Sequence, residues 1–164
     1  MWKKFILALT ALTFVAACSS KKKDDDVIDT MEVDGGITEQ PIGFDPMGSD
    51  SGNIQGLATV HFEYDRFSLS PEARNILSQN ADFLRSNGNV SLQIEGHCDS
   101  RGSIEYNLTL GERRANSVKS YLVSLGIPES RLSVLSYGEE KPLNAGDNEE
   151  AHAANRRANF VPIQ

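Results

Sequence analysis

The stretch that decides the fold is residues 94–118, IEGHCDSRGSIEYNLTLGERRANSV. It begins with the alternation of a strand, continues through a glycine-bounded loop, and ends in a helical pattern. The loop carries Asp99 and Arg101, and the helical part carries Arg113 and Arg114. We therefore expect a carboxylate and several guanidinium groups to converge on one loop.

Helical spacing separates the two adjacent arginines of this stretch. Arg114 shares with Leu110 a row that adjoins the buried side of the predicted helix, whereas Arg113 lies further round toward solvent. Arg114 is therefore expected to point back at the loop. There Asp99 would accept an ammonium group and Arg114 would hold a carboxylate with two hydrogen bonds, which predicts an amino-acid-like ligand. The alternative, that Asp99 and Arg114 simply pair with each other, stays open.

The segments around this stretch alternate between strand and helix patterns. Ser70 followed by a proline marks one helix start, and small residues at positions 111 and 115 should let the longest helix approach the sheet closely. The order predicts an α/β two-layer sandwich, β-α-β-α-β-(α)-β. The expected segments are strand 59–64, a helix from 71 that ends at Asn87-Gly88, strand 90–95, helix 108–125, strand 131–137, helix 149–155 and strand 157–163.

The composition of the chain argues against several classes of function. The 164 residues carry 16 Lys and Arg against 23 Asp and Glu, a net charge of -7, which disfavours nucleic acid as a partner. The two cysteines, Cys18 and Cys98, stand in such different contexts that neither a disulfide nor a cysteine zinc site is expected. The three histidines are scattered and the sequence has no glycine-rich phosphate loop, so we expect no metal and no cofactor.

The N-terminus has the pattern of a secretion signal. Residues 1–17 contain two lysines followed by a short apolar run that ends in small residues, as in a cleaved signal peptide; the alternative is an uncleaved anchor helix. The segment VAACSS, residues 15–20, resembles the lipobox of bacterial lipoproteins. That resemblance implies that Cys18 is acylated and becomes the mature N-terminus, and that Ser19 directs sorting to the outer membrane.

Residues 18–54 are predicted to form a flexible linker between the lipid anchor and a domain at 55–164. Three lysines precede three aspartates near its start, and Gly, Pro, Asp and Ser follow without a period of 2 or 3.6. Such a tether would let the domain search a layer away from the membrane. The alternative is an ordered arm that docks on the domain through residues such as Ile42 and Phe44.

The adjacent His97 and Cys98, followed by Arg101, raise the alternative of a phosphatase loop. The tyrosine-phosphatase pattern requires an arginine where this chain has Ile104, and Arg101 comes too early. Neighbouring side chains in an extended chain also point apart, which disfavours contact between a nucleophile and its base. We therefore expect no enzyme, with Cys98 as a small semi-buried residue and His97 as a hydrogen-bonding residue that closes the loop.

Five segments together resemble the OmpA-like peptidoglycan-binding domain, and they span residues 55–164 in order. The resemblance implies an α/β sandwich with a mixed four-stranded sheet, and as ligand the diaminopimelate-bearing peptide of Gram-negative peptidoglycan. It also implies a wall anchor that tethers the outer membrane to the cell wall in a Tol-type envelope and cell-division system, with the periplasmic propeller protein TolB as partner. The matching segments are VHFEYD at 60–65, GHCDSRG at 96–102, EYNLTLGERRAN at 105–116, SYGEEKP at 136–142 and NRR at 155–157.

By this resemblance Asp99 would meet the ammonium of the diaminopimelate side chain and Arg114 its carboxylate. Cys98 departs from the family, which often has Thr or Ala there, and the segment 65–68 differs from commoner versions. Whether Arg101 touches the ligand or a protein partner stays open, as does a protein-interaction module of the same fold without wall binding. The other residues implied to line the pocket are Asp65, Phe67, Arg101, Asn107 and Leu110.

Overall fold

Strands and helices alternate along the part of the chain that the computed structural model describes, residues 48–163. The leader 1–17, the acylation site Cys18 and the segment 18–47, with Ile42 and Phe44, lie outside the described residues. Within residues 48–163, no helix has the length and apolar character needed to cross a bilayer. The elements are η1 (Gly48–Ser51), β1 (Val60–His61), α1 (Pro71–Ser86), β2 (Ser91–His97), α2 (Ile104–Ser124), η2 (Glu129–Arg131), β3 (Leu132–Gly138), α3 (Glu149–Asn155) and β4 (Arg157–Ile163).

The four strands form one mixed sheet in the order β1-β4-β2-β3. β2 and β3 run parallel, whereas β4 runs antiparallel to both of its neighbours, β1 and β2. The last strand of the chain therefore lies inside the sheet, with Phe160 opposite Ile94 of β2. This arrangement confirms the predicted fold, an α/β sandwich with a mixed four-stranded sheet.

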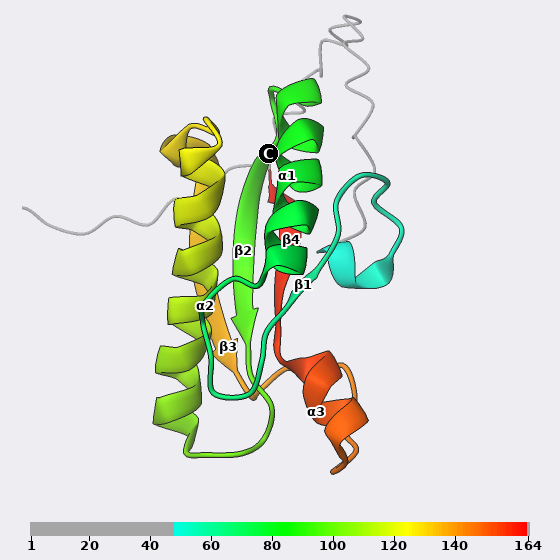
Figure 1. Cartoon of the computed structure of the whole chain (residues 1–164), viewed down its shortest axis with the longest axis vertical. Helices are drawn as coiled ribbons and strands as arrows, with labels where there is room; N and C mark the ends of the chain where they lie inside the picture. The colour runs from blue at the N-terminus through cyan, green and yellow to red at the C-terminus, as the bar shows by residue number, and fades with distance from the viewer. Residues whose placement is uncertain (1–47, 164) are drawn as a thin grey trace, which may run out of the picture. The chain divides into compact units, whose positions relative to one another are not determined.

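Helices α1 and α2 lie side by side on one face of the sheet, and α3 lies at the end where β4 begins (Figure 1). Burial of large apolar side chains between these two layers is the main stabilising contribution, about 1.5–3 kcal/mol for each side chain. The fully buried apolar side chains of this core include Leu77 and Leu84 of α1, Val118 and Leu122 of α2, Leu92 and Ile94 of β2, and Phe160 of β4.

Local sequence signals predicted the helices well. Ser70 caps α1, because its side chain accepts a hydrogen bond from the backbone N–H of Ala73. The segments predicted for α3 and β4 match the structure in both bounds. Helix α2 begins four residues earlier than predicted, at Ile104, because the side chain of Ser103 caps it.

The first strand is shorter than predicted. A strand was expected over 59–64, but β1 is only Val60–His61. Phe62 still bonds the carbonyl of Arg156 through its N–H, after which a turn bends the chain away from the sheet. Asp65 has a φ of 53°, in the left-handed region that few residues other than glycine adopt, which is incompatible with a continuing strand.

Residues 48–54 belong to the folded unit, although the sequence placed them in the linker. The hydroxyl of Ser49 donates to Asn159 Oδ1 at 2.8 Å, and Asp50 forms a buried ion pair of 2.8 Å with Arg157. Ile54 joins the apolar core at 8% exposure. These contacts join segments more than 100 residues apart and leave no local period in the sequence, so pattern analysis could not detect them.

Candidate functional site

The candidate site is positioned by a close contact between α2 and β2. A Cβ atom added to Gly96 would lie 1.9 Å from the carbonyl oxygen of Gly111, and one added to Gly111 would lie 2.9 Å from the carbonyl oxygen of Gly96 and 2.3 Å from the Ser136 hydroxyl of β3. Only glycine at both positions lets the helix approach the strand so closely, as predicted for position 111. Since Arg114 lies one turn beyond Gly111, this contact brings it beside the loop that follows β2.

Asn107 holds the loop between β2 and α2. Its side-chain amide donates to the carbonyls of Asp99 and Arg101, both at 3.2 Å, and to the carboxylate of Glu139 at 2.5 Å. The Asn107 side chain is buried in the first turn of α2. Asn107 therefore fixes the backbone on both sides of position 100 and sets the direction of the Asp99 side chain.

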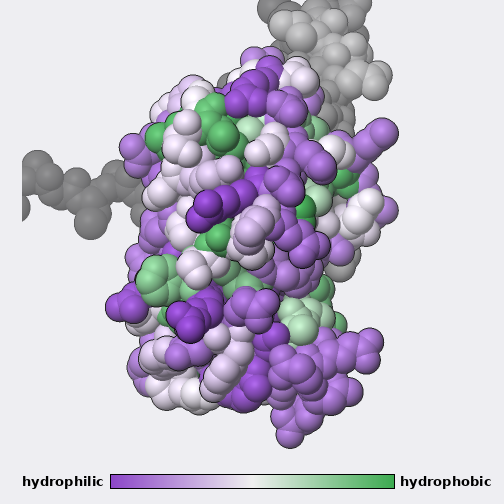
Figure 2. All heavy atoms as spheres, viewed as in Figure 1, coloured by the Kyte–Doolittle hydropathy of each residue, from purple (hydrophilic) through white to green (hydrophobic). Residues whose placement is uncertain are grey.

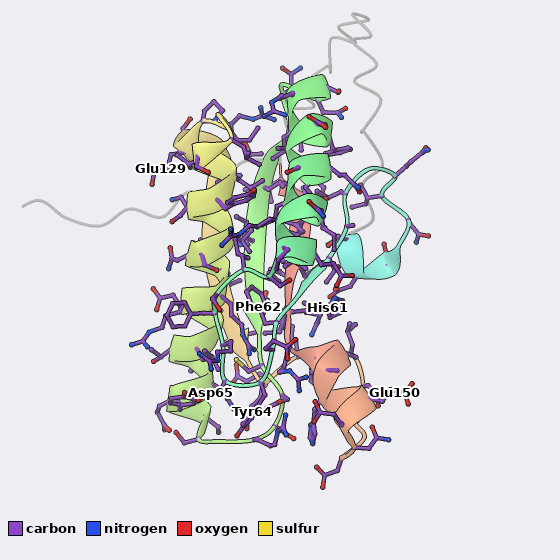
Figure 3. The ribbon with its side chains drawn as sticks, in the orientation of Figure 1. His61, Phe62, Tyr64, Asp65, Glu129 and Glu150 are labelled. Carbon is purple, nitrogen blue, oxygen red and sulfur yellow. The ribbon has the colours of Figure 1, made fainter. Side chains whose placement is uncertain are left out.

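A cavity of about 210 Å³ opens between this loop, the start of α2 and the turn after β1. Figure 3 shows Tyr64 and Asp65 at this end of the molecule, and Figure 2 shows that the surface there is mainly hydrophilic. Of the seven predicted ligand-site residues, six line the cavity. The lining residues are Tyr64, Asp65, Cys98, Asp99, Arg101, Gly102, Tyr106, Asn107, Leu110 and Arg114.

Phe67 is the predicted site residue that does not line this cavity. It is half exposed and lies over the guanidinium of Arg113, 5.9 Å from the ring centre, in a separate shallow groove along α2. Phe67 therefore lies next to the candidate site, whose cavity is lined by Asp99 and Arg114 but not by Phe67.

The Arg114 side chain is 1% exposed and points into the interior beside the cavity, whereas Arg113 is exposed. The Arg114 guanidinium donates to the carbonyl oxygens of Arg66 and His97, both at 2.8 Å, and to that of Glu63 at 3.2 Å. Within residues 48–163 no carboxylate forms an ion pair with Arg114. Burial lowers the pKa of Arg114, because it disfavours the charged form. A cationic group without an acidic partner among the described residues faces the cavity.

Asp99 pairs with other arginines, which removes the alternative of an Asp99–Arg114 bridge. Its Oδ2 atom accepts from Arg101 at 2.5 Å and from Arg156 at 3.2 Å, and the side chain is 5% exposed. Burial is the largest influence on the pKa of Asp99 and would raise it, but the hydrogen bonds from the two arginines outweigh burial and hold the pKa below its ordinary value. Asp99 is therefore an anion at neutral pH.

The sequence analysis missed several members of this site. Arg156 and Glu149 complete the charge cluster, with Arg156 donating to Glu149 at 2.8 Å and Arg101 lying 3.4 Å from the same carboxylate. Arg156 occurs in the NRR segment that matched the family, but nothing local indicated that α3 would bring it to Asp99. Tyr64 and Tyr106 were also not predicted to line the cavity, although Tyr64 immediately precedes the predicted residue Asp65.

The two tyrosines flank the mouth of the cavity. The Tyr106 hydroxyl donates a short hydrogen bond to Asp65 Oδ1, and the ring of Tyr64 stacks under the Arg101 guanidinium at 4.0 Å. Hydrogen bonding to the carboxylate of Asp65 raises the pKa of Tyr106. The turn after β1 is thus connected to the start of α2 across the cavity.

Cys98 and His97 lie in the interior. Burial raises the pKa of the Cys98 thiol to about 11, so at neutral pH it is protonated and a poor nucleophile. The prediction that His97 closes the loop by hydrogen bonding is wrong: within residues 48–163 neither ring nitrogen forms a hydrogen bond, and Glu95 Oε2 lies 3.8 Å from Nε2, too far for one. His97 instead stacks on Tyr137, with ring centres 5.5 Å apart, and burial lowers its pKa.

Comparison with known proteins shows which family this chain belongs to. Residues 61–156 match the model of the OmpA family. A peptidoglycan-associated lipoprotein of Pseudomonas putida is 37% identical over 94% of this chain and 93% of its own length, and one of Pasteurella multocida is 36% identical over 94% of both. The chain therefore belongs to the OmpA family. Within that family it is homologous to proteins named peptidoglycan-associated lipoprotein.

Solved structures agree with this assignment. The crystal structure of the peptidoglycan-associated lipoprotein from Burkholderia pseudomallei has a TM-score of 0.62 and 37% sequence identity, covering 64% of this chain and 89% of that one. The C-terminal domain of Helicobacter pylori MotB has a TM-score of 0.62 at 21% identity, covering 66% of this chain and 86% of that one. The second likeness concerns the fold alone.

Proposed function

We propose that this protein binds peptidoglycan without catalysis, by holding the free end of the diaminopimelate side chain between Asp99 and Arg114. The observation that carries the proposal is the buried guanidinium of Arg114, which faces a cavity and has no carboxylate partner within residues 48–163. A buried charge is costly unless it is paired, so such a group indicates an anionic ligand group. The names of the relatives support the wall as its source.

The chemistry of the cavity matches an amino-acid head group. The far end of diaminopimelate carries an ammonium and a carboxylate on one carbon, and the cavity is lined by an ionised aspartate and an arginine that has no carboxylate partner within residues 48–163. A volume of about 210 Å³ suits the end of one side chain and is smaller than the pockets of about 300–1,000 Å³ that enclose drug-sized ligands. The glycan chain would remain outside.

The cellular setting is part of the same proposal. Acylation at Cys18 would anchor the chain in the outer membrane, with the domain in the periplasm bound to the wall. The protein would thereby tether the outer membrane to the wall, and the family resemblance adds a role in cell division and a TolB-like propeller as partner. Support comes from the lipobox in the sequence and from relatives named as lipoproteins.

Sedimentation with insoluble peptidoglycan tests this function. Wild-type protein should pellet with diaminopimelate-type peptidoglycan, and Asp99→Asn, which removes the charge but keeps the shape, should stay in the supernatant. Glu129→Gln is the matched control, because Glu129 is exposed and lies at the opposite end of the domain (Figure 3). Wild-type protein in the supernatant, or Asp99→Asn in the pellet, would contradict the proposal. A protein-interaction module without wall binding would give the first of these results.

A further inference from the structure

We propose that Arg101 competes with the ligand's ammonium group for Asp99, and that ligand binding transfers the Arg101 guanidinium from Asp99 to Glu149. The inference rests on the proposed function and concerns the same cavity. It assigns Arg101 as a positioning residue that sets how strongly the site demands an ammonium group.

The starting point is an excess of cations on one carboxylate. Oδ2 of Asp99 accepts from Arg101 Nε at 3.2 Å and Nη2 at 2.5 Å, and from Arg156 Nη1 at 3.2 Å. The other oxygen, Oδ1, accepts the backbone N–H of Arg101 at 3.3 Å. An ammonium group arriving at Asp99 would be a third cation on a single negative charge, so its binding is favoured when one guanidinium leaves.

Arg101 is the guanidinium that can leave. Its side chain is 35% exposed, whereas that of Arg156 is 7% exposed. Arg156 also donates to the carbonyl of Phe62 at 3.0 Å and to Glu149 at 2.8 Å, and both bonds would be lost if it moved. Arg101 is more exposed and Arg156 would lose two further hydrogen bonds, so releasing Arg101 costs less than releasing Arg156.

A second carboxylate already lies within reach of Arg101 while it pairs with Asp99. Nη1 of Arg101 lies 3.4 Å from Glu149 Oε2, and this carboxylate is 66% exposed. The guanidinium lies 4.0 Å above the ring centre of Tyr64, which provides a surface along which it can turn. A change of side-chain rotamer would therefore keep Arg101 paired with Glu149 while Oδ2 of Asp99 retains only Arg156.

The exchange has a consequence for selectivity. A ligand that carries an ammonium replaces one cation on Asp99 by another, whereas a neutral ligand cannot displace Arg101 and finds Asp99 occupied. The competition weakens binding of the correct ligand by a small factor, in the same way as any equilibrium between competent and non-competent states. In return it excludes wall fragments whose side-chain amine is blocked.

Two ligands and two substitutions test this mechanism by calorimetric titration of the full chain. The probes are a soluble muropeptide with a free diaminopimelate side-chain amine and the same peptide with that amine acetylated. Arg101→Gln should bind the free-amine peptide about two- to fivefold more tightly than wild type, as expected for loss of a partly exposed competing ion pair. It should also bind the acetylated peptide more tightly, by at least the same factor, because Arg101 no longer occupies Asp99.

Glu149→Gln removes the second carboxylate within reach of Arg101 but keeps an oxygen that accepts from Arg156. It should weaken binding of the free-amine peptide about two- to fivefold in the wild-type background and have no effect in the Arg101→Gln background. Thermal melts of all variants check that each one folds.

Weaker or unchanged binding of the free-amine peptide by Arg101→Gln would overturn the inference, as would an equal effect of Glu149→Gln in both backgrounds. These outcomes are distinct from failure of the proposed function. In that case the wild-type protein would not bind the free-amine peptide, or Asp99→Asn would bind it as well as wild type.

Discussion

Arg114 connects the fold to the candidate site through one guanidinium. Three carbonyl oxygens of two different segments, 63–66 after β1 and His97 at the end of β2, accept its hydrogen bonds. These bonds fix the planar group in one orientation beside the cavity. Its position is therefore set before any ligand arrives, which reduces the entropy lost on binding.

Replacement of Arg114 should affect both stability and binding. Arg114→Ala removes the donor to the buried carbonyl of His97 and to two partly buried carbonyls, and should lower the free energy of unfolding by about 1–3 kcal/mol, measured by urea denaturation. Arg114→Lys retains the charge but not the planar fork and should weaken muropeptide binding at least about tenfold. Arg113→Ala is the control, since Arg113 is exposed, and should change neither quantity. A loss as large in Arg113→Ala would contradict this account.

Cys98 makes stability depend on pH in the alkaline range. Its pKa rises from 9.0 to about 11 on folding, so between these values the unfolded chain loses a proton that the folded chain keeps. The free energy of unfolding should therefore fall as pH rises from about 9 to 11, by about 2–3 kcal/mol from this group alone. Comparison with Cys98→Ala in urea melts at each pH isolates the contribution. Parallel pH curves for the two proteins would show that the thiol does not contribute.

At the scale of elements, the contact between α2 and β2 determines the distance between the two ends of the site. β2 leads into Asp99 and α2 carries Arg114. The close approach of Gly96 to Gly111 therefore sets how near the Asp99 loop lies to Arg114. A change in that contact should alter stability and ligand binding together.

Gly96→Ala tests this dependence. Its Cβ would overlap the Gly111 carbonyl, so we expect a loss of about 1–3 kcal/mol or more in the free energy of unfolding and weaker muropeptide binding in the protein that still folds. Gly88→Ala is the matched control, because a Cβ at this position meets no atom within 4 Å. Denaturant melts and calorimetric titration measure the two effects. Gly96→Ala with wild-type stability would contradict the structure.

Local signals made most elements predictable, and tertiary contacts account for what was missed. The cap at Ser70, the helix at 149–155 and the strand at 157–163 follow from residues adjacent in sequence. The buried orientation of Arg114 followed from helical spacing alone. The pairing of Asp99 with Arg156 did not, because it joins residues 57 positions apart and depends on how α3 packs.

At the scale of the whole domain, η1 is fastened to the middle of the sheet. Asp50 pairs with Arg157, and the hydroxyl of Ser49 accepts from the N–H of Phe160 at 3.0 Å. β4 is an inner strand, so η1 is joined to a strand that has neighbours on both sides.

Asp50→Ala should destabilise the domain strongly. It leaves the Arg157 guanidinium, 4% exposed, without its carboxylate, and removing one partner of a buried pair costs about 3–5 kcal/mol. Asp82→Ala breaks an exposed pair with Arg85 and should cost less than about 1 kcal/mol. Chemical denaturation of both variants gives the comparison. Equal losses would show that η1 does not contribute to the stability of the sheet.

The most direct test of the central claim compares two soluble stem peptides that differ only in the third residue, meso-diaminopimelate or lysine. Lysine lacks the carboxylate proposed to meet Arg114, so its binding would leave that buried guanidinium unpaired. Calorimetric titration of the wild-type protein should give at least about tenfold tighter binding of the diaminopimelate peptide. Equal affinity for the two peptides would contradict the account.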